Sequence, residues 1–102
     1  MDATAYLAPT VYVEPGARVG RSVRIAAGSW VEREAVVGPG TEIGAGVHVG
    51  RSVVIGENAR VGSHTSIGDG ASIGARARVG ADQKVPTGEV IPEAAADFTR
   101  AA

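Results

Sequence analysis

Aliphatic residues recur at every sixth position through most of this sequence. One column of the six-residue frame holds only Leu, Val and Ile from Leu7 to Ile91, and no insertion or deletion breaks the register. The column two places before it holds small residues, until it lapses to Gln83 and Glu89. A strict six-residue period drifts around a helix of about 3.6 residues per turn. The pattern therefore predicts short β-strands in which these two columns face inward and the residue between them faces outward.

Glycine and proline mark the corners between these strands. The fifteen glycines occupy only two columns, one place and three places after the aliphatic residue. Pro15-Gly16 and Pro39-Gly40 have the sequence of type II turns, in which glycine takes a positive φ, and Asn58 in the same column tolerates that conformation. Equivalent corners close the strands into a coil. The sequence predicts an all-β fold, a parallel β-helix with triangular coils of 18 residues, over residues 1–91.

Several repeats resemble the hexapeptide motif of bacterial acyltransferases. In Val37-Gly38-Pro39-Gly40-Thr41 and Ile67-Gly68-Asp69-Gly70-Ala71, an aliphatic residue is followed by glycine, two variable positions and a small residue. The stretch from Tyr6 to Gly20 is similar to the UDP-N-acetylglucosamine acyltransferase group. The resemblance implies a single-stranded left-handed coil and a homotrimer about an axis parallel to it. Carbonic anhydrases of the γ class and non-catalytic scaffolds share this coil, so the resemblance specifies the fold more closely than the function.

The C-terminal residues 92–102 depart from the repeat. From Pro92 to Phe98 the chain has a proline, an acid and a run of alanines, which predicts a short helix. The polar Gln83 and Glu89 at inward positions indicate that the apolar interior ends near there. Because a solenoid needs a cap at its open end, we expect this helix to cover the last coil.

Composition excludes several classes of partner and chemistry. The formal net charge is −1, and charged residues make up 21% of the chain without forming runs, so neither nucleic acid nor an anionic membrane is an expected partner. The absence of cysteine excludes disulfides and thiolate chemistry. No apolar stretch has the length of a signal peptide or a membrane span. We therefore expect a cytoplasmic protein.

One outward column carries valines where a free solenoid would place polar groups. Outward residues eighteen apart should stack in adjacent coils, about 4.8 Å from each other. Val36, Val54 and Val90 fall in one such ladder. An exposed apolar stripe predicts an interface, and we assign this one to the trimer contact, although scattered valines also occur on ordinary strand surfaces.

Two further ladders have simpler interpretations. Arg24, Glu42 and Arg60 alternate in sign, which predicts a solvated row of salt bridges of small energetic value, with an anion site as the lesser alternative. Tyr12 and Trp30 are one coil apart, which predicts aromatic stacking on the face of a sheet, with ligand binding as the lesser alternative.

The sequence holds two histidines, His48 and His64, as candidate bases. In the acyltransferase group that the chain resembles, the catalytic histidine follows another by three residues. His48 matches the earlier one, and Arg51 takes the catalytic place. Arginine keeps its proton and cannot act as a general base. His64, in the corner column, could face a subunit cleft together with Asp82, one coil further on; the alternative is a solvent-exposed corner residue.

These observations leave two classes of function open. The two histidines have the wrong number and spacing for the three-histidine zinc site of γ-class carbonic anhydrases, so we expect no metal. No loop interrupts the coils to enclose a ligand, which favours a trimeric scaffold or assembly module that lacks a complete catalytic site and a cofactor. The alternative is a small trimeric acyltransferase that uses an acyl-CoA donor, with His64 as the general base and Asp82 orienting it.

Overall fold

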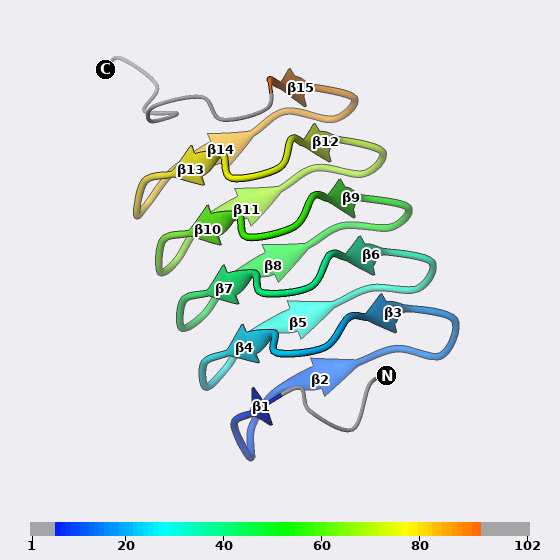
Figure 1. The fold of residues 1–102 in the computed structure, drawn as a ribbon, viewed down its shortest axis with the longest axis vertical. Coiled ribbons are helices and arrows are strands. Elements are labelled where there is room, and N and C mark those ends of the chain that lie inside the picture. The colour runs from blue at the N-terminus through cyan, green and yellow to red at the C-terminus, as the bar shows by residue number, and fades with distance from the viewer. Residues whose placement is uncertain (1–5, 93–102) are drawn as a thin grey trace.

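The computed structural model describes residues 6–92, which form a stack of short strands joined by equivalent corners (Figure 1). This part of the chain contains fifteen β-strands of two residues each. They are β1 (Tyr6–Leu7), β2 (Tyr12–Val13), β3 (Arg18–Val19), β4 (Arg24–Ile25), β5 (Trp30–Val31), β6 (Val36–Val37), β7 (Glu42–Ile43), β8 (His48–Val49), β9 (Val54–Ile55), β10 (Arg60–Val61), β11 (Ser66–Ile67), β12 (Ser72–Ile73), β13 (Arg78–Val79), β14 (Lys84–Val85) and β15 (Val90–Ile91).

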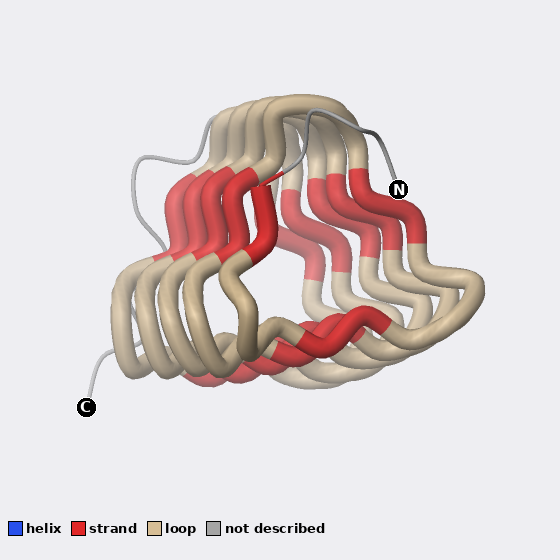
Figure 2. Tube along the Cα trace, turned by 90° about the horizontal axis from the view of Figure 1, so that it is seen from below, coloured by secondary structure: helices blue, strands red, loops and turns tan. Residues whose placement is uncertain are grey.

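The strands build three parallel sheets that form the sides of a triangular coil (Figure 2). The β1 sheet has the order β1-β4-β7-β10-β13, the β2 sheet β2-β5-β8-β11-β14, and the β3 sheet β3-β6-β9-β12-β15. Each strand pairs with the strand eighteen residues further on, as in the Tyr6–Arg24 and Val36–Val54 register pairs. In Figure 1, the β2-sheet strands run to the right at the back while the links at the front return to the left, so the coil is left-handed. The predicted β-helix with coils of 18 residues is confirmed.

The aliphatic column fills the interior of the coil. From Val19 to Ile91 each of its members is less than 5% exposed, whereas Leu7 and Val13 at the first coil are only half-buried. Gln83 and Glu89 are half-buried, as expected where the apolar interior ends. The predicted helix begins at Pro92, and residues 93–102 lie outside the described part of the chain.

Three hydroxyl side chains also face the interior and are fully buried. Each donates a hydrogen bond to the carbonyl oxygen of a glycine fifteen residues further along the chain, at 2.7 or 2.8 Å. The pairs are Ser29 with Gly44, Thr41 with Gly56, and Thr65 with Gly80. Among the described residues, no buried side-chain polar atom lacks a partner. The hydroxyls therefore satisfy their own hydrogen-bonding needs and those of the corner backbone.

The two glycine columns have different physical causes. The column three places after the aliphatic residue has a positive φ, which is +87° at Gly16 and +56° at Asn58. The column one place after it is crowded instead: a Cβ added to Gly56 would lie 2.5 Å from the backbone nitrogen of Ala75. Glycine there allows the corners of successive coils to approach closely, which the sequence pattern did not predict.

Candidate functional site

Three aromatic side chains follow one another on the outer face of the β2 sheet. The rings of Tyr12 and Trp30 meet edge to face, with centroids 5.7 Å apart and planes at 66°. The Trp30 and His48 rings are 5.5 Å apart and tilted by 53°. The predicted contact between Tyr12 and Trp30 is confirmed as an edge-to-face arrangement, which aromatic pairs prefer over a face-to-face sandwich. His48 extends this row by one coil.

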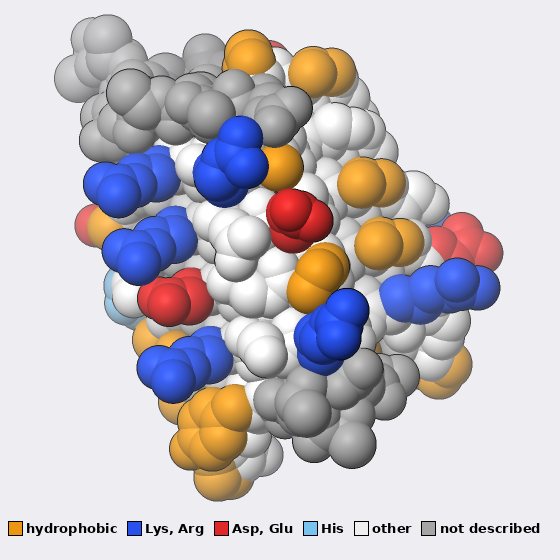
Figure 3. All heavy atoms as spheres, viewed as in Figure 1, with side chains coloured by type: hydrophobic (Ala, Val, Ile, Leu, Met, Phe, Trp, Pro, Cys, Tyr) orange, Lys and Arg blue, Asp and Glu red, His pale blue; other side chains and the backbone are white. Residues whose placement is uncertain are grey.

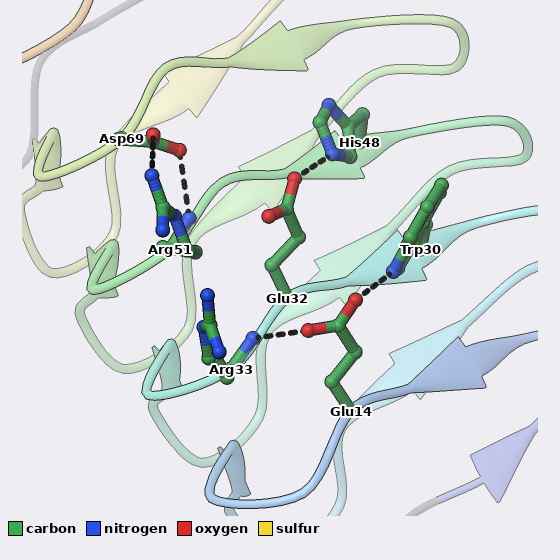
Figure 4. A network of polar contacts seen from close by, with 7 residues as sticks. All are labelled: Glu14, Trp30, Glu32, Arg33, His48, Arg51 and Asp69. Carbon is green, nitrogen blue, oxygen red and sulfur yellow. Dashed lines mark hydrogen bonds and ion pairs between the residues drawn. The ribbon is translucent and has the colours of Figure 1, made fainter.

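Two glutamates beside the aromatic row fix the orientation of its rings (Figure 4). The Trp30 indole N–H donates to Glu14 Oε2 at 3.0 Å, and the Arg33 backbone N–H donates to Glu14 Oε1 at 3.1 Å. In the next coil, His48 Nε2 pairs with Glu32 Oε2. Sequence reasoning missed both glutamates. The signal was available, because each glutamate precedes its aromatic partner by sixteen residues.

The pairing with Glu32 gives His48 the geometry of a general base. A carboxylate that accepts the Nε2 hydrogen selects the tautomer in which Nδ1 carries a lone pair. Within residues 6–92, Glu32 is the only hydrogen-bond or ion-pair partner of the His48 side chain, so Nδ1 is free to accept a proton. The side chains of His48 and Glu32 are 43% and 20% exposed, so the imidazole remains accessible while its orienting carboxylate is largely shielded. A base held by a third group is the arrangement that acyl transfer requires.

His48 also borders a small groove on the surface of the coil. This groove has a volume of about 330 Å³, and its polar lining includes Ser66, Asp69 and Lys84. Ser66 is the register partner of His48 in the next coil, and Lys84 is the partner of Ser66. An imidazole, a hydroxyl and an ammonium group therefore line one side of the groove in sequence.

Asp69 is tied to the corner that follows β8. Its Oδ1 accepts a hydrogen bond from the Arg51 backbone N–H at 2.9 Å, and its Oδ2 accepts one from Arg51 Nη2 at 3.4 Å (Figure 4). The Arg51 backbone N–H, assisted by the guanidinium of the same residue, lowers the pKa of the Asp69 carboxyl below its ordinary value. Arg51, which stands where a catalytic histidine would be expected, therefore positions Asp69 at the edge of the groove.

The structure places His64 and Asp82 at equivalent corners of adjacent coils. Both are exposed and have a positive φ, +62° for His64 and +59° for Asp82. No hydrogen bond or ion pair joins their side chains in the described part of the chain. Their assignment as a catalytic pair stays a prediction, and His48 has the stronger geometry for a base.

The valine ladder lies outward on the β3 sheet. Val36, Val54 and Val90 are 37%, 48% and 68% exposed, although each is a large apolar residue. Val36 and Val54 are register partners in adjacent coils. The stripe is thus present on the surface of the single chain, and its assignment as a trimer contact stays a prediction.

The predicted row of salt bridges on the β1 sheet is wrong. Glu42 is in register with both Arg24 and Arg60, yet within residues 6–92 it forms an ion pair with neither of them. Exposed pairs of this kind gain little energy and restrict two long side chains, so the alternation in sign does not suffice to form them.

The described residues offer neither a cluster of metal ligands nor a membrane-spanning helix. Residues 6–92 contain no group of three or more His, Asp or Glu side chains placed to hold a metal ion. None of these residues belongs to a helix long and apolar enough to cross a bilayer.

Comparison with known proteins agrees with the repeat and the coil. Residues 34–68 match the family model described as bacterial transferase hexapeptide (six repeats). The structure resembles GDP-perosamine N-acetyltransferase from Caulobacter crescentus, solved with CoA and GDP-perosamine, with a TM-score of 0.71 and 25% identity over 89% of this chain and 52% of that one. The sequence matches no curated protein.

Two serine acetyltransferases from Entamoeba histolytica, both solved with cysteine, share the fold. Serine acetyltransferase 1 has a TM-score of 0.67 and 17% identity over 79% of this chain and 38% of its own. Isoform 3 has a TM-score of 0.68 and 20% identity over 88% of this chain and 35% of its own. The chain thus spans about half of the perosamine enzyme and just over a third of the serine enzymes. The six-residue repeat and the coils of 18 residues show that the chain is a parallel β-helix, and its residues 34–68 match the hexapeptide-repeat family.

Proposed function

We propose that this chain is the β-helix of a CoA-dependent acyltransferase in which His48 is the general base and Glu32 orients it. The observation that carries the proposal is the pairing of His48 Nε2 with Glu32 at the border of the groove lined by Ser66 and Lys84. The resemblance at 25% identity to an N-acetyltransferase solved with CoA supports the choice of donor. This proposal replaces His64 by His48 as the favoured base.

The reaction follows from the position of the free ring nitrogen. As the amine or hydroxyl of the acceptor attacks the thioester carbonyl, His48 Nδ1 takes its proton. The new amide or ester bond forms, the carbon–sulfur bond breaks, and the imidazolium returns the proton to the departing thiolate of CoA. Glu32 keeps the ring in the reactive tautomer and stabilises the imidazolium that exists between the two proton transfers.

A homotrimer supplies what the single coil lacks. In the described residues the corners carry no inserted loop, so one chain offers only open grooves to a ligand. The exposed Val36, Val54 and Val90 support the packing of a second copy against the β3 sheet. Walls contributed by two copies would then enclose donor and acceptor between subunits.

The test is an acyl-transfer assay with acetyl-CoA and longer acyl-CoA donors against sugar, amine and alcohol acceptors. In the wild type we expect release of free CoA that depends on the acceptor. His48→Asn should lower kcat by about 10²-fold or more, as removal of a general base does. Glu32→Gln should lower kcat less and shift the pH profile, because the base remains but loses its orienting charge.

His64→Ala is the matched control, because it removes the other histidine from an exposed corner. It should leave the rate unchanged if His48 is the base. A rate that disappears in His64→Ala and persists in His48→Asn would overturn the assignment in favour of His64 and Asp82.

A scaffold is the second candidate, favoured by the unbroken series of coils from β1 to β15. In that case no donor and acceptor pair should give turnover above background, and no acyl-CoA should raise the melting temperature as a specific ligand must. Light scattering should still report an assembled oligomer. This combination of results would refute the enzymatic proposal.

A further inference from the structure

A groove over the outer face of the β1 sheet carries arginines that form no ion pair with an acidic side chain of residues 6–92. Its volume is about 560 Å³, and the outward residues of all five strands of the sheet line it. They are Tyr6, Arg24, Glu42, Arg60 and Arg78. Three arginines against one glutamate give this face an excess of two positive charges. Figure 3 shows basic side chains along the edge of the molecule where β4, β10 and β13 lie, with one acidic side chain among them.

Arg60 and Arg78 are the unusual members of this row. They are direct register partners on β10 and β13, so their strands are about 4.8 Å apart. Like charges directly opposite each other destabilise a sheet. In the described residues neither arginine forms an ion pair, not even Arg60 with Glu42, its other register partner. Two adjacent guanidinium groups therefore present their hydrogen-bond donors to the groove unused.

We propose that Arg60 and Arg78 bind the two phosphoryl groups of a diphosphate. The guanidinium group offers a planar fork of N–H donors that matches phosphate oxygens, and two forks one coil apart can each take one phosphoryl group. A ligand with two adjacent negative charges also removes the repulsion between the two arginines, which a single neutral ligand would not.

Glu42 gives the bound diphosphate a direction. Its carboxylate repels phosphoryl oxygens, so these lie on the side of Arg60 that faces Arg78. The same carboxylate accepts hydrogen bonds from hydroxyl groups. The ligand class is therefore a diphosphate ester whose hydroxyl-bearing group points toward Glu42. A nucleoside diphosphate and a sugar diphosphate both present this chemistry.

The site stands apart from the proposed acyl transfer. His48 and Glu32 belong to the β2 sheet and the corner after β5, whereas the arginines lie on the β1 sheet. Binding at the arginines requires no turnover, so either proposal can fail without the other.

Calorimetric titration at low salt with inorganic pyrophosphate, inorganic phosphate and ADP tests the site. We expect pyrophosphate to bind more tightly than phosphate. Arg60→Gln and Arg78→Gln should each weaken pyrophosphate binding about tenfold or more, as loss of one charge-assisted contact does. Arg21→Gln is the matched control, because it removes the same charge from an exposed corner outside the groove and should change the affinity less than about twofold.

Glu42→Gln tests separately how the site binds the diphosphate and how it binds the hydroxyl-bearing group of the ligand. It should strengthen pyrophosphate binding by removing a repulsion, and it should lower the affinity for ADP relative to pyrophosphate, because a neutral amide oxygen accepts hydrogen bonds from the ribose hydroxyls more weakly than a carboxylate does. Absence of pyrophosphate binding to the folded wild type would overturn the proposal. An equal loss of affinity in Arg21→Gln would also overturn it, because that result indicates a general effect of net charge. Unchanged circular dichroism of each variant establishes that the fold is retained.

Discussion

The glycines at positions 56 and 70 allow the same added methyl group to be tested in two environments. In Gly56→Ala the new Cβ would lie 2.5 Å from the Ala75 backbone nitrogen and 2.8 Å from its Cα. Reaching an ordinary contact of 3.4 Å requires an opening of about 0.9 Å, the difference between 3.4 and 2.5 Å. The neighbouring coils are held there by Gly56 N–H to Ile73 O at 2.7 Å and Arg76 N–H to Glu57 O at 2.8 Å.

The cost of Gly56→Ala follows from these contacts. Overpacking against backbone costs about 1–3 kcal/mol, and each weakened hydrogen bond adds about 1 kcal/mol. We expect a loss of about 3 kcal/mol or more in the free energy of unfolding. Gly70 has nothing within 4 Å of an added Cβ, but its φ is +70°. Gly70→Ala should therefore cost about 1–2 kcal/mol from backbone strain alone.

Asparagine separates strain from crowding. Gly70→Asn should be close to neutral, because Asn58 occupies the equivalent corner at φ +56°. Gly56→Asn should be as damaging as Gly56→Ala, since the clash begins at Cβ. Urea denaturation followed by far-ultraviolet circular dichroism measures all four variants. Equal stability of Gly56→Ala and Gly70→Asn would refute the explanation given for the two glycine columns.

Three further predictions concern a charge, an interface and the core. In the folded protein the pKa of Asp69 lies below its ordinary value of 3.8. The stabilisation that the ionised carboxylate gives is therefore present above pH 3.8 and is lost as the pH falls through the folded pKa. An NMR titration of this carboxyl group with a midpoint at or above 3.8 would contradict this prediction. Val36→Lys combined with Val54→Lys places like charges at the proposed trimer contact and should give monomers by light scattering, and an unchanged mass would exclude that contact. Ile55→Asp should bury an unpaired carboxylate at a cost of several kcal/mol and unfold the chain, whereas a soluble variant with native circular dichroism would contradict the inward register of Ile55.

The coil could be predicted from the sequence because one physical cause repeats at every sixth residue. A column in which every residue is aliphatic indicates a continuous apolar interior. Ile55, whose side chain is 1% exposed, is typical of this column. The positive φ at Gly16 could also be anticipated, because a proline precedes it. The crowding at Gly56 could not, because it depends on the distance between the corners of two coils rather than on local conformation.

The candidate site was harder to predict, because its contacts depend on the length and direction of side chains and not only on which residues are in register between coils. The spacing of eighteen residues predicts the outward ladders correctly, but opposite charges in register do not always form ion pairs. Glu42 shows that they need not, since it is in register with two arginines and pairs with neither. The glutamates that do form contacts belong to a corner column and reach ladder residues at a separation of sixteen.

The contact between a glutamate and an aromatic ring occurs in two successive coils, and it leaves a proton-accepting nitrogen in only one of them. Glu14 holds Trp30 in the same way that Glu32 holds His48, and both partners lie on the β2 sheet. The indole has one ring nitrogen, which is a hydrogen-bond donor only, so Trp30 cannot accept a proton. The imidazole has a second nitrogen, so the same carboxylate leaves it oriented and able to accept a proton. In the next coil Gly50 takes the place of the glutamate, and the series of carboxylate contacts ends with His48.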